Sequence, residues 1–226
     1  MLRTWLIALM ALTLWGCGES PTMAAKSRIL LMGDSLMASN RGTGTAVADQ
    51  IEAHLGEEVV DRSVAGARYF YTLPISGAAG MRLPAQYLSG NWEWVVMSGY
   101  GNDILFGCGC GKCDDEMNRL ISADGSSGAI VDEVRFIRNS GARVVYTGYL
   151  RTPGFASPVE RCGPIGTELD RRIALFAATD PGITFVSLAD IVPSGDHSYH
   201  SADRIHPSPK GSAAIGAKVA AVIEGQ

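Results

Sequence analysis

The chain of 226 residues is poor in charge and has no strong excess of either sign. Charged residues make up 19% of it, the formal net charge is −4, and the basic residues are scattered along the chain. A nucleic-acid partner normally requires a basic patch or stripe, so the sequence predicts no nucleic-acid binding. The hydrophobic content of 46% is that of an ordinary globular protein, and the length allows one medium domain with a substantial core.

Several common catalytic, nucleotide-binding and metal-binding motifs are missing as well. The chain has no Gly-x-Ser-x-Gly nucleophile elbow and no Walker Gly-Lys-Ser/Thr sequence. Gly42-Thr43-Gly44 begins like a dinucleotide fingerprint, but Val47 stands where the third glycine belongs. The four histidines lack the spacing of metal ligands. We therefore expect no metal and no other cofactor.

Three of the histidines have ordinary surroundings. His54 lies in a helical pattern, and His197 and His200 lie in a polar loop, so structural or surface roles are expected for all three. His206 differs, because Asp203 and Pro207 accompany it.

The most apolar stretch, Trp5 to Trp15, is too short to span a membrane comfortably, which takes roughly 17–25 residues. It follows a positively charged start and suits the core of a signal peptide. Leu14-Trp15-Gly16-Cys17 then resembles the lipobox of bacterial lipoprotein precursors. The sequence therefore predicts a signal peptide over residues 1–17 and a lipid anchor on Cys17 that attaches the protein to a membrane.

Residues 18–27 are small and polar, which is typical of a flexible tether between a membrane and a domain. The expected location is the bacterial cell envelope, as a lipoprotein facing the periplasm. Cleavage by ordinary signal peptidase near Ala24-Ala25 would instead give a soluble periplasmic or secreted protein. An uncleaved amino-terminal anchor or a buried helix is the remaining interpretation of the apolar stretch.

The cysteine count fits an exported protein. Beyond Cys17 the chain has Cys108, Cys110, Cys113 and Cys162, an even number that favours two disulfides in an oxidising compartment. We expect Cys162 to pair with one of the other three, and a direct Cys108–Cys110 bond is the least favourable because its ring is so small. A four-thiolate zinc site is the alternative, since Cys110-x-x-Cys113 has a plausible ligand spacing.

From residue 28 onward, short apolar runs alternate with helical patterns. The predicted strands cover 28–32, 57–62, 93–98, 142–148 and 183–187. The predicted helices cover 43–55, 126–140, 165–178 and 208–224, and residues 101–125 are expected to form a Gly- and Cys-rich loop. Apolar strands separated by helices indicate an α/β domain, residues 28–226, with a parallel sheet covered on both faces.

Three polar motifs follow predicted strands or precede the last helix. Gly33-Asp34-Ser35-Leu36 follows the first strand, and Gly99-Tyr100-Gly101-Asn102-Asp103 follows the third. Asp203-Arg204-Ile205-His206-Pro207 precedes the last helix. A serine hydroxyl becomes a useful nucleophile when a histidine takes its proton and a carboxylate orients that histidine. Ligands bind at the carboxyl ends of parallel strands, so these motifs should meet at one edge of the sheet.

At these residues the chain resembles the SGNH hydrolases, also called the GDSL esterase/lipase family, over roughly residues 28–222. The resemblance implies a flavodoxin-like three-layer α/β/α sandwich with a five-stranded parallel sheet. It implies Ser35 as the nucleophile, with Asp203 and His206 completing the catalytic triad. It further implies an oxyanion hole made by Ser35, Gly66 of the Ser63-Val64-Ala65-Gly66 block, and Asn102. Taken alone, Asn102-Asp103 is also consistent with a helix cap.

The sequence therefore predicts an exported serine esterase that hydrolyses small-molecule or glycan carboxylic esters. Tyr100 stands where the family usually has glycine, and together with the cysteine-bonded loop it favours short acyl groups. The alternatives are a carbohydrate O-acetyl esterase of envelope polysaccharide and a lysophospholipase or thioesterase. A non-catalytic envelope binding protein is an alternative from another functional class.

Overall fold

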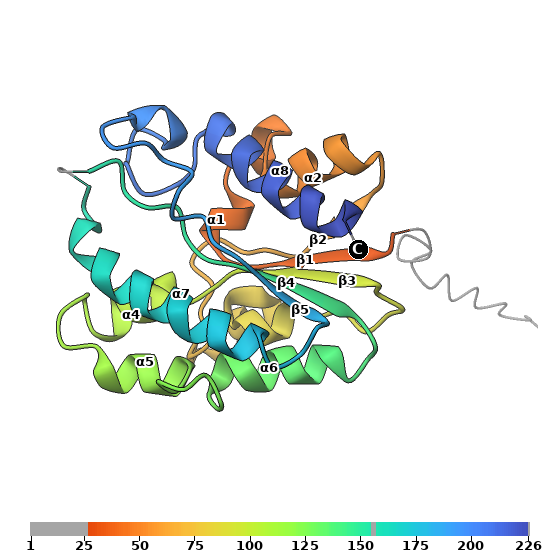
Figure 1. The fold of residues 1–226 in the computed structure, drawn as a ribbon, viewed down its shortest axis with the longest axis horizontal. Helices are drawn as coiled ribbons and strands as arrows, with labels where there is room; N and C mark the ends of the chain where they lie inside the picture. The colour runs from red at the N-terminus through yellow and green to blue at the C-terminus, as the bar shows by residue number, and fades with distance from the viewer. Residues whose placement is uncertain (1–26, 155–156, 226) are drawn as a thin grey trace, which may run out of the picture.

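The computed structural model describes residues 27–154 and 157–225, which form a sheet between two layers of helices (Figure 1). The predicted signal peptide, the lipidation of Cys17 and the tether up to residue 26 lie outside the described residues. Within the described ranges, no helix is long and apolar enough to cross a membrane.

Five strands form the sheet: β1 (Ile29–Met32), β2 (Val59–Asp61), β3 (Trp94–Met97), β4 (Arg143–Thr147) and β5 (Ile183–Val186). Their order across the sheet is β2-β1-β3-β4-β5, and every neighbouring pair is parallel. Each strand lies within one of the five segments that the apolar runs predicted. The predicted α/β/α sandwich with a five-stranded parallel sheet is therefore confirmed.

Alternate residues of the strands build two separate cores. In β1, Ile29 and Leu31 pack with the helices of one layer, whereas Leu30 and Met32 pack with those of the other. All four side chains are fully buried. Burial on both faces explains why the strands are continuously apolar, since each such side chain contributes about 1.5–3 kcal/mol when it leaves water.

One layer contains α2 (Val47–Leu55) and α8 (Pro209–Glu224), and the other contains α6 (Ala129–Arg138) and α7 (Gly163–Ala177) (Figure 1). These four helices correspond to the four predicted ones. The largest difference is at α2, which begins at Val47 rather than at residue 43. Arg41–Thr43 forms a 3₁₀ turn that ends at Gly44, whose left-handed φ of 66° interrupts the helical pattern.

The prediction of a loop over residues 101–125 was wrong. This segment contains α4 (Gly101–Gly107) and α5 (Asp114–Leu120). Each helix has only seven residues, too few for its period to be read from the sequence, and isolated helices of that length are unstable. Tertiary packing stabilises them, because Ile104, Met117 and Leu120 lie in the core beneath the sheet.

The remaining elements are short turns of helix. They are α1 (Ser35–Ala38), η2 (Arg41–Thr43), α3 (Pro74–Ser76), η3 (Gly77–Met81), η4 (Leu83–Gln86), η5 (Glu160–Cys162) and η6 (His197–Tyr199).

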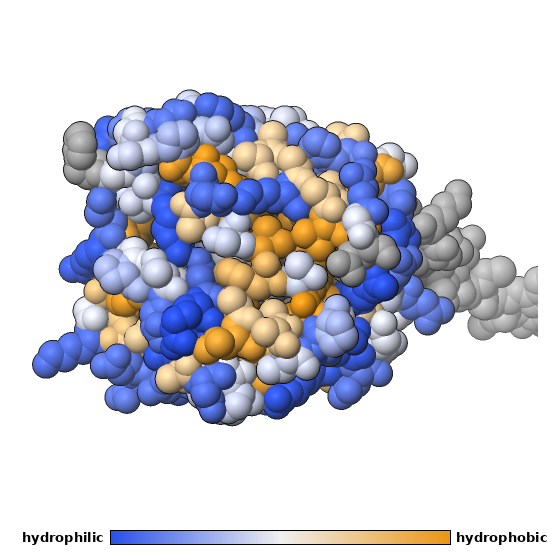
Figure 2. Space-filling model, in the orientation of Figure 1, coloured by the Kyte–Doolittle hydropathy of each residue, from blue (hydrophilic) through white to orange (hydrophobic). Residues whose placement is uncertain are grey.

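In the view of Figure 2, apolar residues reach the surface over β5, between α7 and α8, with polar residues around them. β5 is an edge strand of four residues, and its shortness limits the unpaired backbone at that edge.

The carboxyl ends of the strands share one edge of the sheet, the edge at which α1 and α4 begin (Figure 1). Ser35 follows β1, Gly66 follows β2 and Asn102 follows β3. The loop after β5 carries Asp203 and His206 to the same edge. The topology therefore gathers the predicted site residues in one place.

Candidate active site

The turn after β1 holds Ser35 at the start of α1. Asp34 caps this helix, since its Oδ1 accepts a hydrogen bond of 2.9 Å from the Leu36 N–H. The buried Gln86 side chain brackets Gly33, accepting from its N–H at 2.7 Å and donating to its carbonyl at 2.9 Å. Both contacts fix the backbone from which the serine hydroxyl projects.

His206 lies between Ser35 and Asp203. Its Nε2 is 2.9 Å from the Ser35 Oγ, and its Nδ1 is 2.5 Å from the Asp203 Oδ2. The other carboxylate oxygen of Asp203 accepts the N–H groups of Ile205 and His206, both at 3.0 Å. The structure therefore brings together three side chains from opposite ends of the chain in a serine–histidine–aspartate relay.

Asp203 stays ionised over almost the whole pH range in which the protein would work. Partial burial acts to raise the pKa of its carboxyl, but the hydrogen bonds from the His206 ring and from two backbone N–H groups outweigh it. The net result is a pKa of about 2. A carboxylate in this position can orient the imidazole and stabilise its protonated form.

Three hydrogen-bond donors surround the space beside Ser35. Among the described residues, neither the Ser35 N–H nor the Gly66 N–H has an acceptor. Gly66 has a left-handed φ of 82°, a conformation that glycine adopts without strain. Asn102 lines the same cavity as these two residues. Ser35, Gly66 and Asn102 therefore line one cavity together.

The Asn102 side chain does not cap a helix. The residue lies inside α4, whose N-cap is Tyr100, and no side chain caps that end. Its Nδ2 donates to the Ala67 carbonyl at 3.1 Å and lies 3.4 Å from the Asp34 Oδ2. The amide thus reaches across to the loop that carries Gly66, and the helix-cap interpretation is wrong.

Asp103 connects α4 to the loop that carries Gly66. Its two carboxylate oxygens accept the backbone N–H groups of Tyr69 and Phe70, both at 2.9 Å. Burial raises the pKa of Asp103 to about 6, although these two N–H groups lower it. In the sequence Asp103 is only part of a motif, whereas in the structure it holds α4 and the Tyr69-Phe70 segment together.

Tyr149 is a residue of the site that sequence analysis missed. Its hydroxyl donates to the Asp34 carboxylate and accepts the N–H groups of Tyr100, at 3.2 Å, and Gly101, at 3.0 Å. It therefore joins the nucleophile turn to the start of α4. Its position directly after β4, at the carboxyl edge of the sheet, is the signal that would have drawn attention to it.

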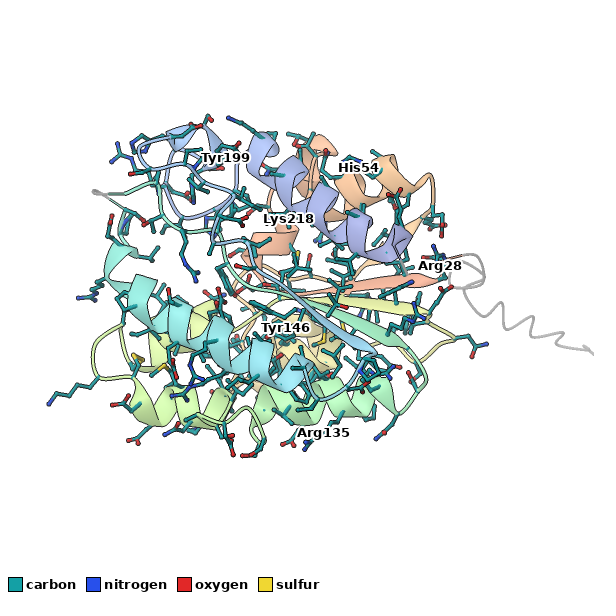
Figure 3. The ribbon with its side chains drawn as sticks, viewed as in Figure 1. Arg28, His54, Arg135, Tyr146, Tyr199 and Lys218 are labelled. Atoms are coloured by element: carbon teal, nitrogen blue, oxygen red, sulfur yellow. A yellow bond between two sulfur atoms is a disulfide. The ribbon has the colours of Figure 1, made fainter. Side chains whose placement is uncertain are left out.

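The Asp34 carboxylate is buried, with an exposed fraction of 1%. Burial raises the pKa of Asp34, while the hydrogen bonds from Tyr149 and the Leu36 N–H oppose that rise. A second tyrosine, Tyr146, lies in the middle of the sheet (Figure 3) and donates to the Gly99 carbonyl at 2.5 Å. Tyr146 in β4 and Tyr149 just after it thus support the loops that follow β1 and β3.

Ser35 and His206 line a cavity of about 510 Å³. Tyr100 also lines it, as the sequence suggested, and its ring packs 4.6 Å from that of Tyr149, centroid to centroid. Most of the wall is apolar and is formed by Ile104, Leu105, Phe106, Leu150, Val159, Ile165 and Ile205. A cavity of this size and lining is typical of a site for a small organic molecule.

Two disulfides support one side of this cavity. Cys108 pairs with Cys113, and Cys110 pairs with Cys162, which itself lines the cavity. This is one of the pairings that the sequence left open, and it leaves none of the four sulfurs for the zinc alternative. Among the described residues, no group of three or more His, Cys, Asp or Glu side chains is placed to hold a metal ion.

The other histidines differ in their surroundings. His54 and His197 are exposed, and Figure 3 places His54 on α2, in the layer opposite α4 and α7. His200 is buried, and it lines the cavity that contains Ser35. Burial lowers the pKa of His200, so it favours the neutral imidazole.

Residues 31–214 match the model of the GDSL-like Lipase/Acylhydrolase family. The chain belongs to this family. Membership implies hydrolysis of acyl esters, and it confirms the resemblance to SGNH hydrolases drawn from the motifs. No curated protein matches the chain significantly.

Solved structures similar to this GDSL-like acylhydrolase have the same fold. A lipase/acylhydrolase from Enterococcus faecalis is 17% identical with a TM-score of 0.63, and the match covers 88% of this chain and 96% of that one. A GDSL-like lipase from Bacteroides thetaiotaomicron is 17% identical with a TM-score of 0.60, covering 88% of each chain. A protein described as an SGNH hydrolase from Slackia heliotrinireducens is 21% identical with a TM-score of 0.59, covering 88% and 99%.

Proposed function

We propose that this GDSL-like acylhydrolase is a serine esterase that uses Ser35, His206 and Asp203 as its catalytic triad. The observation that carries the proposal is the unbroken relay from the Ser35 Oγ to the His206 Nε2, at 2.9 Å, and from the His206 Nδ1 to Asp203, at 2.5 Å. The relay opens into a cavity large enough for both halves of a small ester.

In this mechanism the Ser35 Oγ attacks the ester carbonyl carbon while the His206 Nε2 takes its proton. Asp203 holds the ring and stabilises the imidazolium. The N–H groups of Ser35 and Gly66 and the Asn102 amide donate to the tetrahedral oxyanion. When the C–O bond breaks, His206 protonates the leaving alcohol, and water then repeats these steps to release the acid.

We propose carboxylic esters with short acyl groups as substrates. The presence of Tyr100 and of the disulfide-bonded Cys162 in the cavity wall supports this preference, because neither can withdraw as a mobile lid would. A second candidate is an enzyme for longer acyl chains, such as a lysophospholipase or thioesterase. The aliphatic lining of the same cavity favours that candidate.

We also propose that the protein is exported and anchored through a lipid on Cys17. The apolar stretch before Cys17 and the lipobox-like Leu14-Trp15-Gly16 support this proposal. The two disulfides agree with an oxidising compartment. Mass spectrometry of the membrane-extracted protein tests it: a diacylglyceryl group on Cys17 is expected, and an unmodified full-length amino terminus would contradict the lipid anchor.

Fluorophosphonate labelling combined with Ser35→Ala tests the triad. The wild type should be labelled and should hydrolyse p-nitrophenyl acetate, whereas Ser35→Ala should lose both properties and keep its melting temperature. Ser126→Ala is the control, because Ser126 is exposed and outside the cavity. Undiminished turnover by Ser35→Ala would rule out the assignment, and a wild type that neither reacts nor hydrolyses any ester would favour the non-catalytic alternative.

A panel of acetyl, butyryl, octanoyl and palmitoyl esters of one leaving group tests the acyl preference. We expect kcat/KM to be highest for acetyl or butyryl. A maximum at octanoyl or palmitoyl would move the second candidate to first place.

A further inference from the structure

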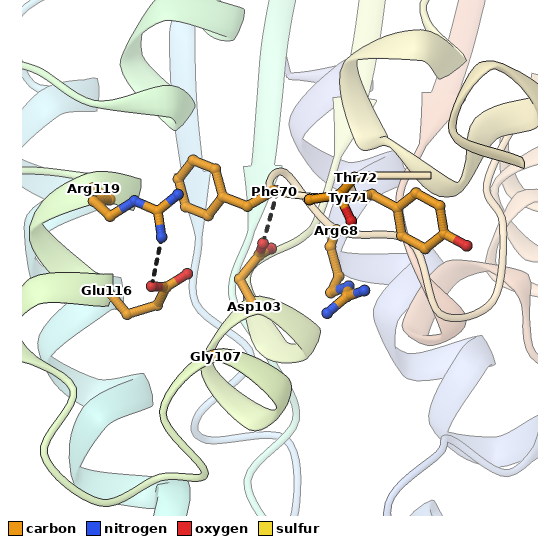
Figure 4. Close-up of a pocket in the computed structure, with 8 residues that line it drawn as sticks. All are labelled: Arg68, Phe70, Tyr71, Thr72, Asp103, Gly107, Glu116 and Arg119. Carbon is orange, nitrogen blue, oxygen red and sulfur yellow. Dashed lines mark hydrogen bonds and ion pairs between the residues drawn. The ribbon is translucent and has the colours of Figure 1, made fainter. Parts of the chain in front are cut away.

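A second cavity, of about 490 Å³, lies against α4, which contributes Asp103 and Gly107 to its wall (Figure 4). Its wall includes Arg68, Phe70, Tyr71, Asp103, Glu116 and Arg119. Consecutive residues of α4 face the two cavities, since Asn102 lines the first and Asp103 lines the second. We call it the Arg68 cavity.

Most charges in the Arg68 cavity already have partners. Arg119 forms an ion pair of 2.9 Å with Glu116, and its guanidinium lies 3.9 Å from the centroid of the Phe70 ring. The two oxygens of Asp103 accept backbone N–H groups. Figure 4 shows this arrangement, with Arg119 and Glu116 on one side of Asp103 and Arg68 on the other.

The Arg68 guanidinium is different. It lies 5.2 Å from the centroid of the Tyr71 ring and 5.3 Å from that of the Phe106 ring. Among the described residues, it forms neither an ion pair nor a side-chain hydrogen bond. Contact with ring faces holds the group in place, and no described protein group accepts its N–H donors, although its charge lowers the pKa of Asp103. A planar guanidinium with free donors is suited to bidentate binding of a carboxylate or phosphate.

The two cavities are neighbours. Phe106 lines the cavity that contains Ser35, and the same ring supports the Arg68 guanidinium in the next one. Phe106 is also 64% exposed, so it forms part of the rim rather than a buried partition. An ester with its carbonyl at Ser35 and an alcohol half long enough to pass Phe106 would place a further group beside Arg68.

We propose that the Arg68 cavity binds an anionic group, a carboxylate or a phosphate, on the alcohol half of the ester that Ser35 cleaves. This inference rests on the proposed function and names the class of its substrate. The rings of Phe70 and Tyr71 flank the anion with apolar surface, and Arg68 supplies its counter-charge.

The test compares three acetate esters whose alcohol halves have the same length and end in a carboxylate, a phosphate or a neutral amide. The quantity measured is the ratio of kcat/KM for each anionic ester to kcat/KM for the neutral one. Arg68→Gln should lower this ratio about 10-fold, the effect of losing a charged hydrogen bond at a partly exposed site. Arg68→Lys keeps the charge and should retain most of the ratio.

Arg135→Gln is the matched control. Arg135 lies on α6 (Figure 3) and also packs on a ring, that of Phe176 at 5.8 Å, but it lines neither cavity. It should keep the wild-type ratio although the net charge changes equally. A fall for one anionic ester only would support the proposal and identify the anion. A ratio within twofold of wild type in Arg68→Gln, or an equal fall in Arg135→Gln, would overturn it.

A binding measurement separates this proposal from the proposed function. Calorimetric titration of Ser35→Ala with the two anionic esters needs no turnover, and adding Arg68→Gln should raise Kd about 10-fold. If the wild type hydrolyses no ester but this difference in Kd appears, the proposed function fails and the anion site stands. If hydrolysis follows the triad but Kd is the same in both variants, the anion site fails and the proposed function stands.

Discussion

Replacing Tyr149 with phenylalanine removes one oxygen atom that makes three hydrogen bonds. The change leaves the N–H groups of Tyr100 and Gly101 without an acceptor and takes a donor from the buried Asp34 carboxylate. Each buried group left unsatisfied costs about 1–3 kcal/mol. Because the bond to Tyr100 is long, at 3.2 Å, and neighbouring groups can relax, we expect Tyr149→Phe to lower the free energy of unfolding by about 2–4 kcal/mol.

Activity should fall more than stability alone would explain. The N–H groups of Tyr100 and Gly101 immediately precede Asn102, so the proposed oxyanion donor and the turn that carries Ser35 lose their common support. A displacement of about 1 Å at such a site can cost about 100-fold in rate. We therefore expect kcat on p-nitrophenyl acetate to fall about 10- to 100-fold, with a smaller change in KM.

The loss of stability should depend on pH in a definite direction. Burial raises the pKa of Asp34, so the folded protein binds this proton more readily than the unfolded chain and loses stability as pH rises through the folded pKa. The Tyr149 hydroxyl opposes that rise, so Tyr149→Phe should raise the pKa of Asp34 further. The charged form of Asp34 is the form that loses its donor, so the deficit in unfolding free energy should grow as pH rises and be larger at pH 8 than at pH 5.

Urea unfolding at both pH values and steady-state kinetics check these expectations. Tyr87→Phe is the control, since the Tyr87 ring packs at 5.3 Å on Phe136 and its hydroxyl has no hydrogen-bond partner among the described residues. It should change neither stability nor kcat appreciably. A Tyr149→Phe variant with kcat within threefold of wild type and the same deficit at pH 5 and pH 8 would refute the reasoning.

The other predictions concern the oxyanion hole, a buried carboxyl and a disulfide. Asn102→Ala should lower kcat about 10²- to 10³-fold with KM little changed, and a raised KM at unchanged kcat would instead make Asn102 a ground-state binding group. Burial raises the pKa of Glu133 from 4.5 to about 7, so the native state loses stability as pH rises across that interval. Glu133→Gln should therefore raise the unfolding free energy by about 1–3 kcal/mol at pH 8 and much less at pH 5, and equal effects in urea titrations at both pH values would contradict this. Replacing Cys110 and Cys162 together with serine opens a bridge between residues 52 apart in sequence and should cost about 2–4 kcal/mol, more than loss of the five-residue bridge, as thermal unfolding would show.

Much of the fold and of the candidate site was predictable from sequence because both depend on local patterns. Strands buried on both faces must be continuously apolar, and their helices show a clear period, so the parallel sheet followed from residues 28–187. Once the strands are parallel, their carboxyl ends share an edge, and Ser35, Asn102 and His206 follow from their motifs. The agreement of spacing, order and strand ends was enough to identify the family.

Only the tertiary structure decided what depends on contacts between distant segments. The Tyr149 hydroxyl meets Asp34 across 115 positions of sequence, and no local pattern distinguishes that hydroxyl from any other. The helices within residues 101–125 are too short to be stable or legible alone and exist because the core and the disulfides hold them. The surroundings of Arg68 are likewise a property of the fold: among the described residues it forms no ion pair, while Glu116 pairs with Arg119 and Asp103 accepts backbone N–H groups. Periodicity along a chain records which side of an element is buried, whereas the register between elements is set by packing in three dimensions.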